Sequence, residues 1–426
     1  MCNQLLENID RVPDLDPELK KRYIGEAKVL RAYSYYELYT KFGDIPYTTK
    51  VLSIKESMSI ARTAKATVIA NVLADLDEVI NGNYLPTSYD ADNKGRITRW
   101  AAMAIKAKIY LFEGNWTQVK NITSTIMTEG GFKLFGSYAG LFEIANEYNS
   151  EVILDAQYRP TSREHQMMYV FLPPTLGGYS QLSPLQELVD SYIMLDGKTI
   201  KETGTSFDES HPYANRDPRL KATVMYTGNS YTLADGTEVV INCEKGEGKD
   251  GYGVGSDCSA TGYYIKKYWD NTYRATLYSG LNPILIRYAD ILLMNAEALA
   301  ELGELDKTAW DATIKPIRDR AGFTLASALE FPEGASKDKL IEIVRNERRS
   351  ELALEGHRHK DIIRWRIADN VLNGWCHGLK TNDVVGTDDG YVRVENRTFN
   401  ANKHYLWPIP QAERDLNGNL EQNPNW

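Results

Sequence analysis

The sequence contains no run of about 18 apolar residues, which a membrane-spanning helix would require. It also lacks a basic balance, because the formal net charge is -9 over 426 residues. Nucleic-acid binding proteins need basic surface to neutralise phosphate groups, so a general nucleic-acid function is excluded. The chain has 4 cysteines and no CxxC pair, so a zinc site is not indicated. Cys243 and Cys258 share one glycine-rich stretch, and the sequence leaves open whether they form a disulfide.

Catalytic and phosphate-binding motifs are absent as well. There is no GxSxG elbow and no HExxH, the glycine-rich loop 246–257 contains no GK[ST], and the 6 histidines are scattered. We therefore predict no catalytic residues, no cofactor and no metal. A glycosidase needs only two carboxylates at the right distance, so a helical glycoside hydrolase remains an alternative.

What the sequence does contain is helical periodicity at both ends and irregular composition in the middle. Residues 132–282 hold short apolar runs punctuated by glycine and proline, and residues 406–426 are rich in proline and asparagine. Pro316 predicts a kink or break in its helix. Short turns between helices with small facing residues are typical of tetratricopeptide-type hairpins. The predicted helices cover residues 17–43, 62–81, 98–116, 116–131, 283–304, 306–323, 336–356 and 359–372.

The stretch "RNERRSELALEGHRHKDIIRW" (345–365) concentrates charge and histidine. A metal site at Glu355, His357 and His359 is one reading. The two histidines are separated by one residue, which on a helix places them about 200° apart. They therefore do not share a helical face, and the spacing argues against the metal site. The stripe that contains Val344 and Leu352 also contains Arg348, so we predict that Arg348 is buried and paired. Its candidate partners are Glu351, Asp290 and Glu297.

Aromatic residues in the middle of the chain are the strongest sign of ligand binding. Sugars bind by stacking an apolar face on an aromatic ring while polar neighbours bond their hydroxyl groups. Core packing is the alternative for each ring, and for Trp269 it is at least as well supported. Trp116, Trp365 and Trp407 fall within helix or tail patterns and are predicted to be structural. The candidate ligand-binding residues are Tyr169, Phe171, Tyr179, Tyr226, Tyr231, Tyr252, Trp269, Tyr273 and Trp375.

A series of seven recognisable segments occurs in order along the chain, at 26–49, 215–224, 262–270, 286–304, 317–323, 345–365 and 406–426. These segments resemble the successive signatures of the SusD/RagB family, the surface nutrient-binding lipoproteins of the Bacteroidetes outer membrane. The resemblance implies a mainly α fold of tetratricopeptide-like hairpins, with a loop-rich region packed on one side. It implies one SusD-like domain over residues 1–426, with hairpins at 17–131 and 283–372, ligand-binding loops at 132–282 and a signature tail at 406–426.

The resemblance also implies a function, with an oligosaccharide as ligand and a SusC-like TonB-dependent outer-membrane transporter as partner. Such proteins are not enzymes and reside at the cell surface. The family normally begins with a lipoprotein signal and an acylated cysteine, and Cys2 lacks the apolar leader that acylation requires. We therefore expect an N-terminally truncated chain whose lipid anchor is missing. A peptide-binding repeat scaffold is a further alternative.

Overall fold

The computed structural model describes residues 1–272, 277–381 and 388–426. It divides into two compact units. Unit 1 comprises Met1–Gly131, His359–Leu372 and Phe399–Trp426, and unit 2 comprises Phe132–Arg358 and Asn373–Thr398. The boundary after residue 131 coincides with the change from helical to irregular sequence. The single domain over residues 1–426 stays a prediction.

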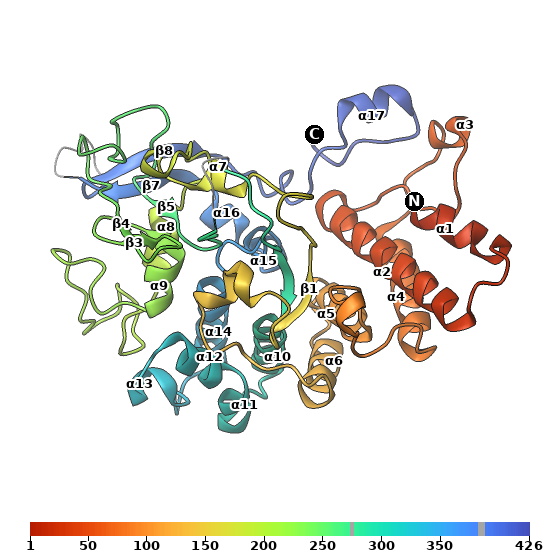
Figure 1. The fold of residues 1–426 in the computed structure, drawn as a ribbon, viewed down its shortest axis with the longest axis horizontal. Helices are drawn as coiled ribbons and strands as arrows, with labels where there is room; N and C mark the ends of the chain where they lie inside the picture. Colours follow the sequence, from red (N-terminus) through yellow and green to blue (C-terminus); the bar gives the residue numbers. More distant parts are fainter. Residues whose placement is uncertain (273–276, 382–387) are drawn as a thin grey trace. The chain divides into compact units, whose positions relative to one another are not determined.

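Unit 1 consists mainly of helices packed as neighbours, α2 on α4, α4 on α5, and α5 on α6 (Figure 1). Residues 113–115 form a short turn between α5 and α6, as in a tetratricopeptide hairpin. The helices are α1 (Cys2–Asn8), α2 (Pro17–Phe42), α3 (Ile54–Ser57), α4 (Lys65–Asn81), α5 (Arg99–Phe112), α6 (Trp116–Glu129), α15 (Arg358–Arg364, from its second residue), α16 (Ala368–Val371) and α17 (Gln411–Leu416).

Local sequence explains where these helices begin and end. At the start of α2 the Asp16 carboxylate accepts a hydrogen bond from the Leu19 backbone N–H at 2.8 Å, and Pro17 occupies the first turn. Gly43, with φ of 71°, ends the helix in a conformation that disfavours residues with a Cβ. On α5, Ala101 and Ala104 are fully buried, which lets neighbouring helices approach closely. The four predicted N-terminal helices are therefore confirmed.

Unit 2 combines longer helices with short antiparallel strand pairs. Within the described residues, β1 pairs with β6, β2 with β5, β3 with β4, and β7 with β8. The strands are β1 (Val152–Asp155), β2 (Val224–Met225), β3 (Ser230–Thr232), β4 (Glu238–Val240), β5 (Tyr264–Ile265), β6 (Ile284–Arg287), β7 (Gly374–Lys380) and β8 (Tyr391–Arg397). The helices are α7 (Met167–Phe171), α8 (Gln186–Ser191), α9 (Pro218–Thr223), α10 (Tyr288–Leu302), α11 (Lys307–Ala312), α12 (Ile314–Ala321), α13 (Ala326–Leu329) and α14 (Lys337–Glu351).

Several predicted helix boundaries in the C-terminal half are wrong. Residues 283–304 begin with strand β6, because Ile284 and Ile286 alternate inward with strand periodicity. The α14 helix ends at Glu351 rather than at Gly356. Residues 359–372 form two helices, interrupted where Arg366 has a φ of 56°. The β7–β8 hairpin was not predicted.

The break predicted by Pro316 is confirmed and lies three residues earlier, at Thr313, between α11 and α12. A proline ring clashes with the carbonyl four residues before it, here that of Ala312, which is the last residue of α11. Pro316 itself is accommodated in the first turn of α12, where backbone N–H groups need no helical partner.

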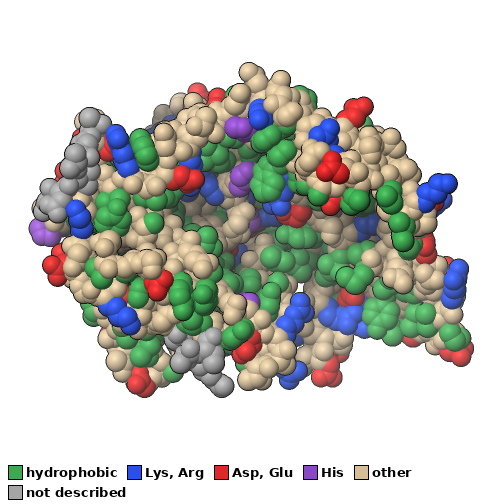
Figure 2. Space-filling view, turned by 90° about the horizontal axis from the view of Figure 1, so that it is seen from above, with side chains coloured by type: hydrophobic (Ala, Val, Ile, Leu, Met, Phe, Trp, Pro, Cys, Tyr) green, Lys and Arg blue, Asp and Glu red, His purple; other side chains and the backbone are tan. Residues whose placement is uncertain are grey.

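The core of unit 2 is rich in tyrosine. Tyr192, Tyr231, Tyr263 and Tyr264 are all buried in one cluster that extends from Tyr138 to Leu379. Much of the high tyrosine content is therefore structural. On the molecular face in Figure 2, acidic and basic side chains are interspersed rather than gathered by sign. The predicted mainly α fold with a loop-rich region is confirmed.

Candidate ligand-binding site

A cavity of about 590 Å³ lies wholly within unit 2. Its volume is within the range typical of small-molecule sites. We call it the unit 2 cavity. Five separate segments form its walls: α8, the segment 207–216, the loop 244–247, Tyr263 and the β7–β8 hairpin. Its lining residues are Gln186, Val189, Phe207, Glu209, Ser210, Pro212, Tyr213, Arg216, Glu244, Lys245, Glu247, Tyr263, Leu379, Lys380, Thr381 and Tyr391.

Hydrogen-bonded tyrosines form part of the cavity wall. The hydroxyl groups of Tyr213 and Tyr263 are 3.2 Å apart, and Tyr263 donates to Oε1 of Gln186 at 2.6 Å. Burial raises the pKa of Tyr213 to about 12 and raises the pKa of Tyr263 well above its ordinary value, so both hydroxyl groups stay neutral at physiological pH. Phe207 and Tyr391 add two more rings. The wall therefore offers apolar ring surface beside neutral hydrogen-bonding groups.

Arg216 occupies the buried side of the cavity. Its guanidinium donates to the backbone carbonyls of Val189, Tyr192 and Pro212 at 2.7 to 2.8 Å, and lies 5.5 Å from the centre of the Phe207 ring. Burial lowers the pKa of this guanidinium. These bonds hold the segment that carries Tyr213 against α8.

The rim of the cavity is charged but balanced. Lys380 pairs with Glu209 at 3.0 Å and lies 5.6 Å from the Tyr391 ring centre. Over the whole lining, Arg216, Lys245 and Lys380 face Glu209, Glu244 and Glu247. The equal number of charges of each sign suits a neutral, hydroxyl-rich ligand better than a highly charged one.

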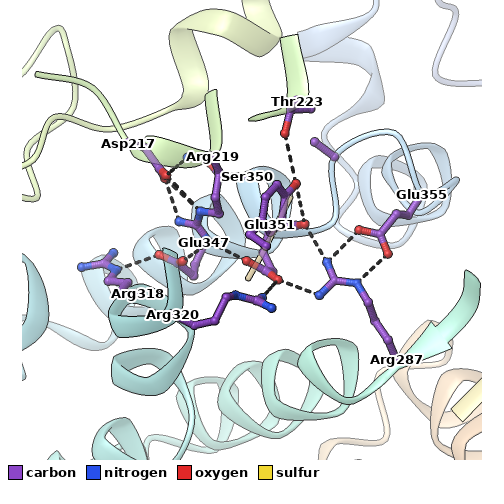
Figure 3. A network of polar contacts seen from close by, with 12 residues as sticks. Asp217, Arg219, Thr223, Arg287, Arg318, Arg320, Glu347, Ser350, Glu351 and Glu355 are labelled. Carbon is purple, nitrogen blue, oxygen red and sulfur yellow. Dashed lines mark hydrogen bonds and ion pairs between the residues drawn. The ribbon is translucent and has the colours of Figure 1, made fainter. Parts of the chain in front are cut away.

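Unit 2 also contains a buried set of ion pairs that we call the carboxylate–guanidinium network (Figure 3). Glu351 on α14 accepts from Arg219 at 2.8 Å, from Arg287 at 2.6 Å and from Arg320. Burial alone would raise the pKa of Glu351, but the three guanidinium groups outweigh it and hold that pKa well below its ordinary value. The network comprises Lys267, Asp217, Arg219, Arg287, Arg318, Arg320, Glu151, Glu347, Glu351 and Glu355.

The network fixes the segment that leads into the unit 2 cavity. Asp217 follows Arg216 directly, and its carboxylate accepts from Arg219 at 2.7 Å. Arg219 in turn reaches Glu347 and Glu351 on α14. These contacts anchor the start of α9 and therefore the end of the cavity-lining segment 207–216.

The network explains the charged stretch 345–365. Arg348 is buried and pairs with Asp290 at 2.6 Å, as predicted. Glu351, the candidate partner one turn away on the same helix, pairs instead with arginines that are distant in the sequence. Both carboxylate oxygens of Glu355 accept from Arg287, and one of them also accepts from Lys267. Both carboxylate oxygens of Glu355 are thus used in ion pairs.

The described residues contain no group of three or more His, Cys, Asp or Glu side chains arranged to hold a metal ion. All four cysteines are free thiols, which answers the question left open for Cys243 and Cys258. Burial raises the pKa of Cys243 to about 12, so this thiol is unreactive. No helix in the described part of the chain has the length and apolar character needed to cross a membrane.

The structure distributes the predicted ligand-binding residues over several locations. Tyr226 stacks on the cavity residue Tyr213, with ring centres 4.0 Å apart and planes at 17°. Tyr252 is half-buried, and its backbone N–H donates to the carbonyl of Cys243, which closes the loop that carries Glu244 and Glu247. These two residues support the cavity without lining it.

Three other predicted residues lie at the surface or near it, outside the cavity lining. Tyr169 and Tyr179 stack on one another, with ring centres 4.2 Å apart, and Tyr179 is 40% exposed. Trp375 is 42% exposed, and the Arg393 guanidinium lies 5.2 Å from its ring centre.

The remaining predictions fall in the core or outside the described residues. Phe171 is buried, and Tyr231 is fully buried with its hydroxyl donating to the Ile265 carbonyl at 2.8 Å. Neither ring is accessible to a ligand, so core packing replaces the predicted contact. Trp269 is half-buried and donates to the Thr232 carbonyl at 2.8 Å. Tyr273 lies outside the described residues.

Sequence reasoning missed the residues that line the unit 2 cavity. Two signals were present: Tyr213 lies two residues before the family signature 215–224, and Tyr263 lies inside the signature 262–270. The signatures were used only to identify the fold. Phe207 and Tyr391 lie outside every recognised segment.

Two family models match the chain. The one described as the SusD family matches residues 141–426, and one described as starch-binding, associating with the outer membrane, matches residues 1–111. The first match covers more than half of the sequence. The chain belongs to the SusD family. It is therefore a binding protein and not an enzyme.

Similar proteins come from Formosa and Bacteroides species. A SusD-like protein of Formosa agariphila is 28% identical over 395 residues, which cover 87% of this chain and 69% of that protein. A SusD-like carbohydrate binding protein from Bacteroides fragilis has 29% identity and a TM-score of 0.88, covering 99% of this chain and 83% of its own. A surface glycan-binding protein A from Bacteroides fluxus shares the fold, with 22% identity, a TM-score of 0.70, and 100% and 82% coverage.

Proposed function

We propose that this protein captures an oligosaccharide in the unit 2 cavity and passes it to a TonB-dependent outer-membrane transporter. The observation that carries the first part is the combination of ring surface, neutral hydroxyl groups and balanced charge in one cavity. A neutral oligosaccharide presents apolar faces and many hydroxyl groups, and it carries no charge that would need a counter-ion. Tyr391 and Phe207 supply rings, while Gln186, Tyr213 and Tyr263 supply hydrogen-bonding groups.

The names of similar proteins support the ligand class. The B. fragilis relative is described as carbohydrate binding, and the B. fluxus relative is described as surface glycan-binding. These properties belong to those proteins, and we extend them to this chain because its cavity has suitable chemistry.

Membership of the SusD family supports the second part of the proposal. The family model for residues 1–111 is described as associating with the outer membrane. We propose attachment through a lipid anchor and docking to a SusC-like transporter through the helical hairpins of unit 1. Purification of the tagged protein from native outer membranes would test this part, and recovery without any TonB-dependent transporter would contradict it.

Calorimetric titration against a panel of neutral oligosaccharides and peptides tests the ligand and the site together. The wild-type protein should bind at least one oligosaccharide. Tyr391→Ala should weaken that binding by about tenfold or more, since truncation of an aromatic hot spot typically costs about 2 kcal/mol or more. Binding only to peptides would favour the repeat-scaffold alternative and refute the proposal.

Two matched aromatic variants locate the site. Tyr179→Ala and Trp375→Ala remove exposed rings that lie outside the cavity lining. Both should retain the wild-type affinity. If either loses affinity while Tyr391→Ala does not, the ligand binds at that surface and not in the unit 2 cavity.

A further inference from the structure

A second cavity, of about 690 Å³, lies wholly within unit 1 and has no part in the proposed function. We call it the unit 1 cavity. The end of α2, the start of α4, the end of α15 and the segment 401–424 contribute to its walls. Five cationic side chains line it, against two anionic ones. They are Arg62, Lys65, Arg364, Arg366 and Lys403, against Asp44 and Glu421.

This excess of positive charge is local, because the whole chain has a formal net charge of -9. It also differs from the unit 2 cavity, whose lining carries equal numbers of cations and anions. A concave site lined by charge of one sign concentrates ligands of the opposite sign. The unit 1 cavity therefore favours an anion.

Two of the five cations are neutralised within the protein. Lys65 pairs with Glu113 at 2.9 Å, and Arg364 pairs with Asp361 at 2.8 Å. Among the residues that the structure describes, Arg62, Arg366 and Lys403 have no carboxylate at ion-pair distance. The positive charge available to a ligand comes from these three.

Arg62 is held in position by uncharged acceptors. It donates to the backbone carbonyls of Asp44, Phe42 and Glu421 at 2.8 to 3.1 Å, and to Oδ1 of Asn423 at 2.6 Å. Four of its five N–H groups are thereby used. Arg62 therefore connects the C-terminal segment to the end of α2. Its main contribution to the cavity is the electrostatic field of its positive charge.

Arg366 and Lys403 are better suited to direct contact. Arg366 lies 4.4 Å from the centre of the Tyr405 ring, and Lys403 lies 4.1 Å from that of Trp426. Cation–π contacts of this kind orient a cation without cancelling its charge. Both groups keep N–H donors that can bond an oxyanion.

Tyr39 adds a neutral group to the same wall. It lines the cavity, and its buried hydroxyl has no hydrogen-bond partner among the described residues. Burial raises the pKa of this hydroxyl, so it remains a donor. A buried donor left without an acceptor is costly, and a ligand oxygen would relieve that cost.

We propose that the unit 1 cavity is an oxyanion site that binds a carboxylate or sulfate group, with Arg366 and Lys403 as the direct contacts. The group can belong to a free anion or to an acidic saccharide, and both share the same recognition chemistry. The site does not depend on glycan binding in the unit 2 cavity.

Calorimetric titrations with sodium sulfate, sodium glucuronate, trigalacturonate and neutral galactotriose test this site. The wild-type protein should bind at least one of the three anionic probes, and the affinity should fall as ionic strength rises. Arg366→Gln combined with Lys403→Gln should reduce that affinity by about tenfold or more, because charge-assisted hydrogen bonds are the strongest contacts available.

Arg11→Gln combined with Lys55→Gln is the matched control. It removes the same charge from exposed positions of unit 1 outside the cavity lining.

The probes distinguish the two sources of the anion. Tighter binding of trigalacturonate than of sulfate or glucuronate assigns the site to acidic saccharides, and comparable affinities assign it to free anions. The proposal fails if no anionic probe binds, or if the control variant loses as much affinity as the cavity variant. Tyr391→Ala, measured in parallel, should leave anion binding unchanged, so failure of this site and failure of the proposed glycan site are separable.

Discussion

The carboxylate–guanidinium network and the unit 2 cavity use similar residue types in the same unit but differ in their access to water. In the network, Arg219, Arg287, Glu347 and Glu351 are at most 1% exposed. At the cavity rim, the paired side chains of Lys380 and Glu209 are 42% and 75% exposed. A dense run of charge in a sequence therefore does not identify a binding site. The network joins α14 to α9, β6 and α12 in the core, whereas we propose that the cavity receives the ligand.

The largest expected effect is on stability, from Glu351→Ala. This substitution removes from the core the carboxylate that pairs with all three of Arg219, Arg287 and Arg320. Breaking a buried ion pair by removing one partner typically destabilises a protein by about 3 to 5 kcal/mol. Denaturant unfolding should show a loss of that size or greater.

Glu330→Ala is the control for this variant. Glu330 also contacts two cations, Lys307 and Lys315, but its side chain is 51% exposed. Exposed pairs typically contribute about 0 to 1 kcal/mol. Equal destabilisation by both substitutions would remove the distinction between buried and exposed charge.

Arg348→Met should destabilise the fold without weakening ligand binding. It removes the guanidinium that pairs with the buried Asp290 carboxylate at 2.6 Å, so this carboxylate loses an ion-pair partner in the core. We expect a loss of about 2 to 4 kcal/mol in unfolding free energy, and unchanged affinity in the fraction that remains folded. A normal melting temperature with lost binding would show that Arg348 belongs to the ligand site.

Acidification should also act on the network. Glu347, Glu351 and Glu355 have pKa values below the ordinary 4.5 because arginine and lysine partners outweigh the effect of burial. A depressed pKa stabilises the folded state above the unfolded-state value, and this contribution is lost as the pH falls toward the folded-state pKa. The melting temperature should therefore be nearly constant between about pH 7 and 5 and fall below about pH 4.5. Glu351→Gln should make that fall shallower, and an unchanged slope would contradict the assignment.

The smallest expected effect is at the cavity rim, from Lys380→Ala. Its ion pair with Glu209 is exposed, so its loss should change stability by less than about 1 kcal/mol. Glycan affinity should fall by less than about threefold, because the rings and buried hydroxyl groups provide the main contacts. A loss of glycan affinity as large as that expected for Tyr391→Ala would show that the main ligand contacts lie at the rim.

Sequence reasoning succeeded where the deciding signals were local. Asp16, Pro17 and Gly43 mark the ends of α2, and helical periodicity placed Arg348 on the buried side of α14. These features depend on residues a few positions apart, so they can be predicted from the sequence before the fold is known.

It failed where the structure joins distant segments. The Arg219–Glu351 pair spans 132 positions, and the Tyr263–Gln186 hydrogen bond spans 77. Nothing in the local pattern distinguishes the cavity residue Tyr213 from the core residue Tyr231. Both are tyrosines in the stretch 132–282, which is loop-rich in sequence, and only the packing of distant segments makes one a cavity wall and the other a core residue.

Hydrogen–deuterium exchange of the wild-type protein, with and without its best oligosaccharide, tests the central claim most directly. The account predicts that the ligand slows exchange in residues 207–216, in the loop 244–252 and around Tyr391, while protection of α14 is unchanged. Slower exchange confined to the segments around Tyr169–Tyr179 or Trp375, with no change at the unit 2 cavity, would contradict it.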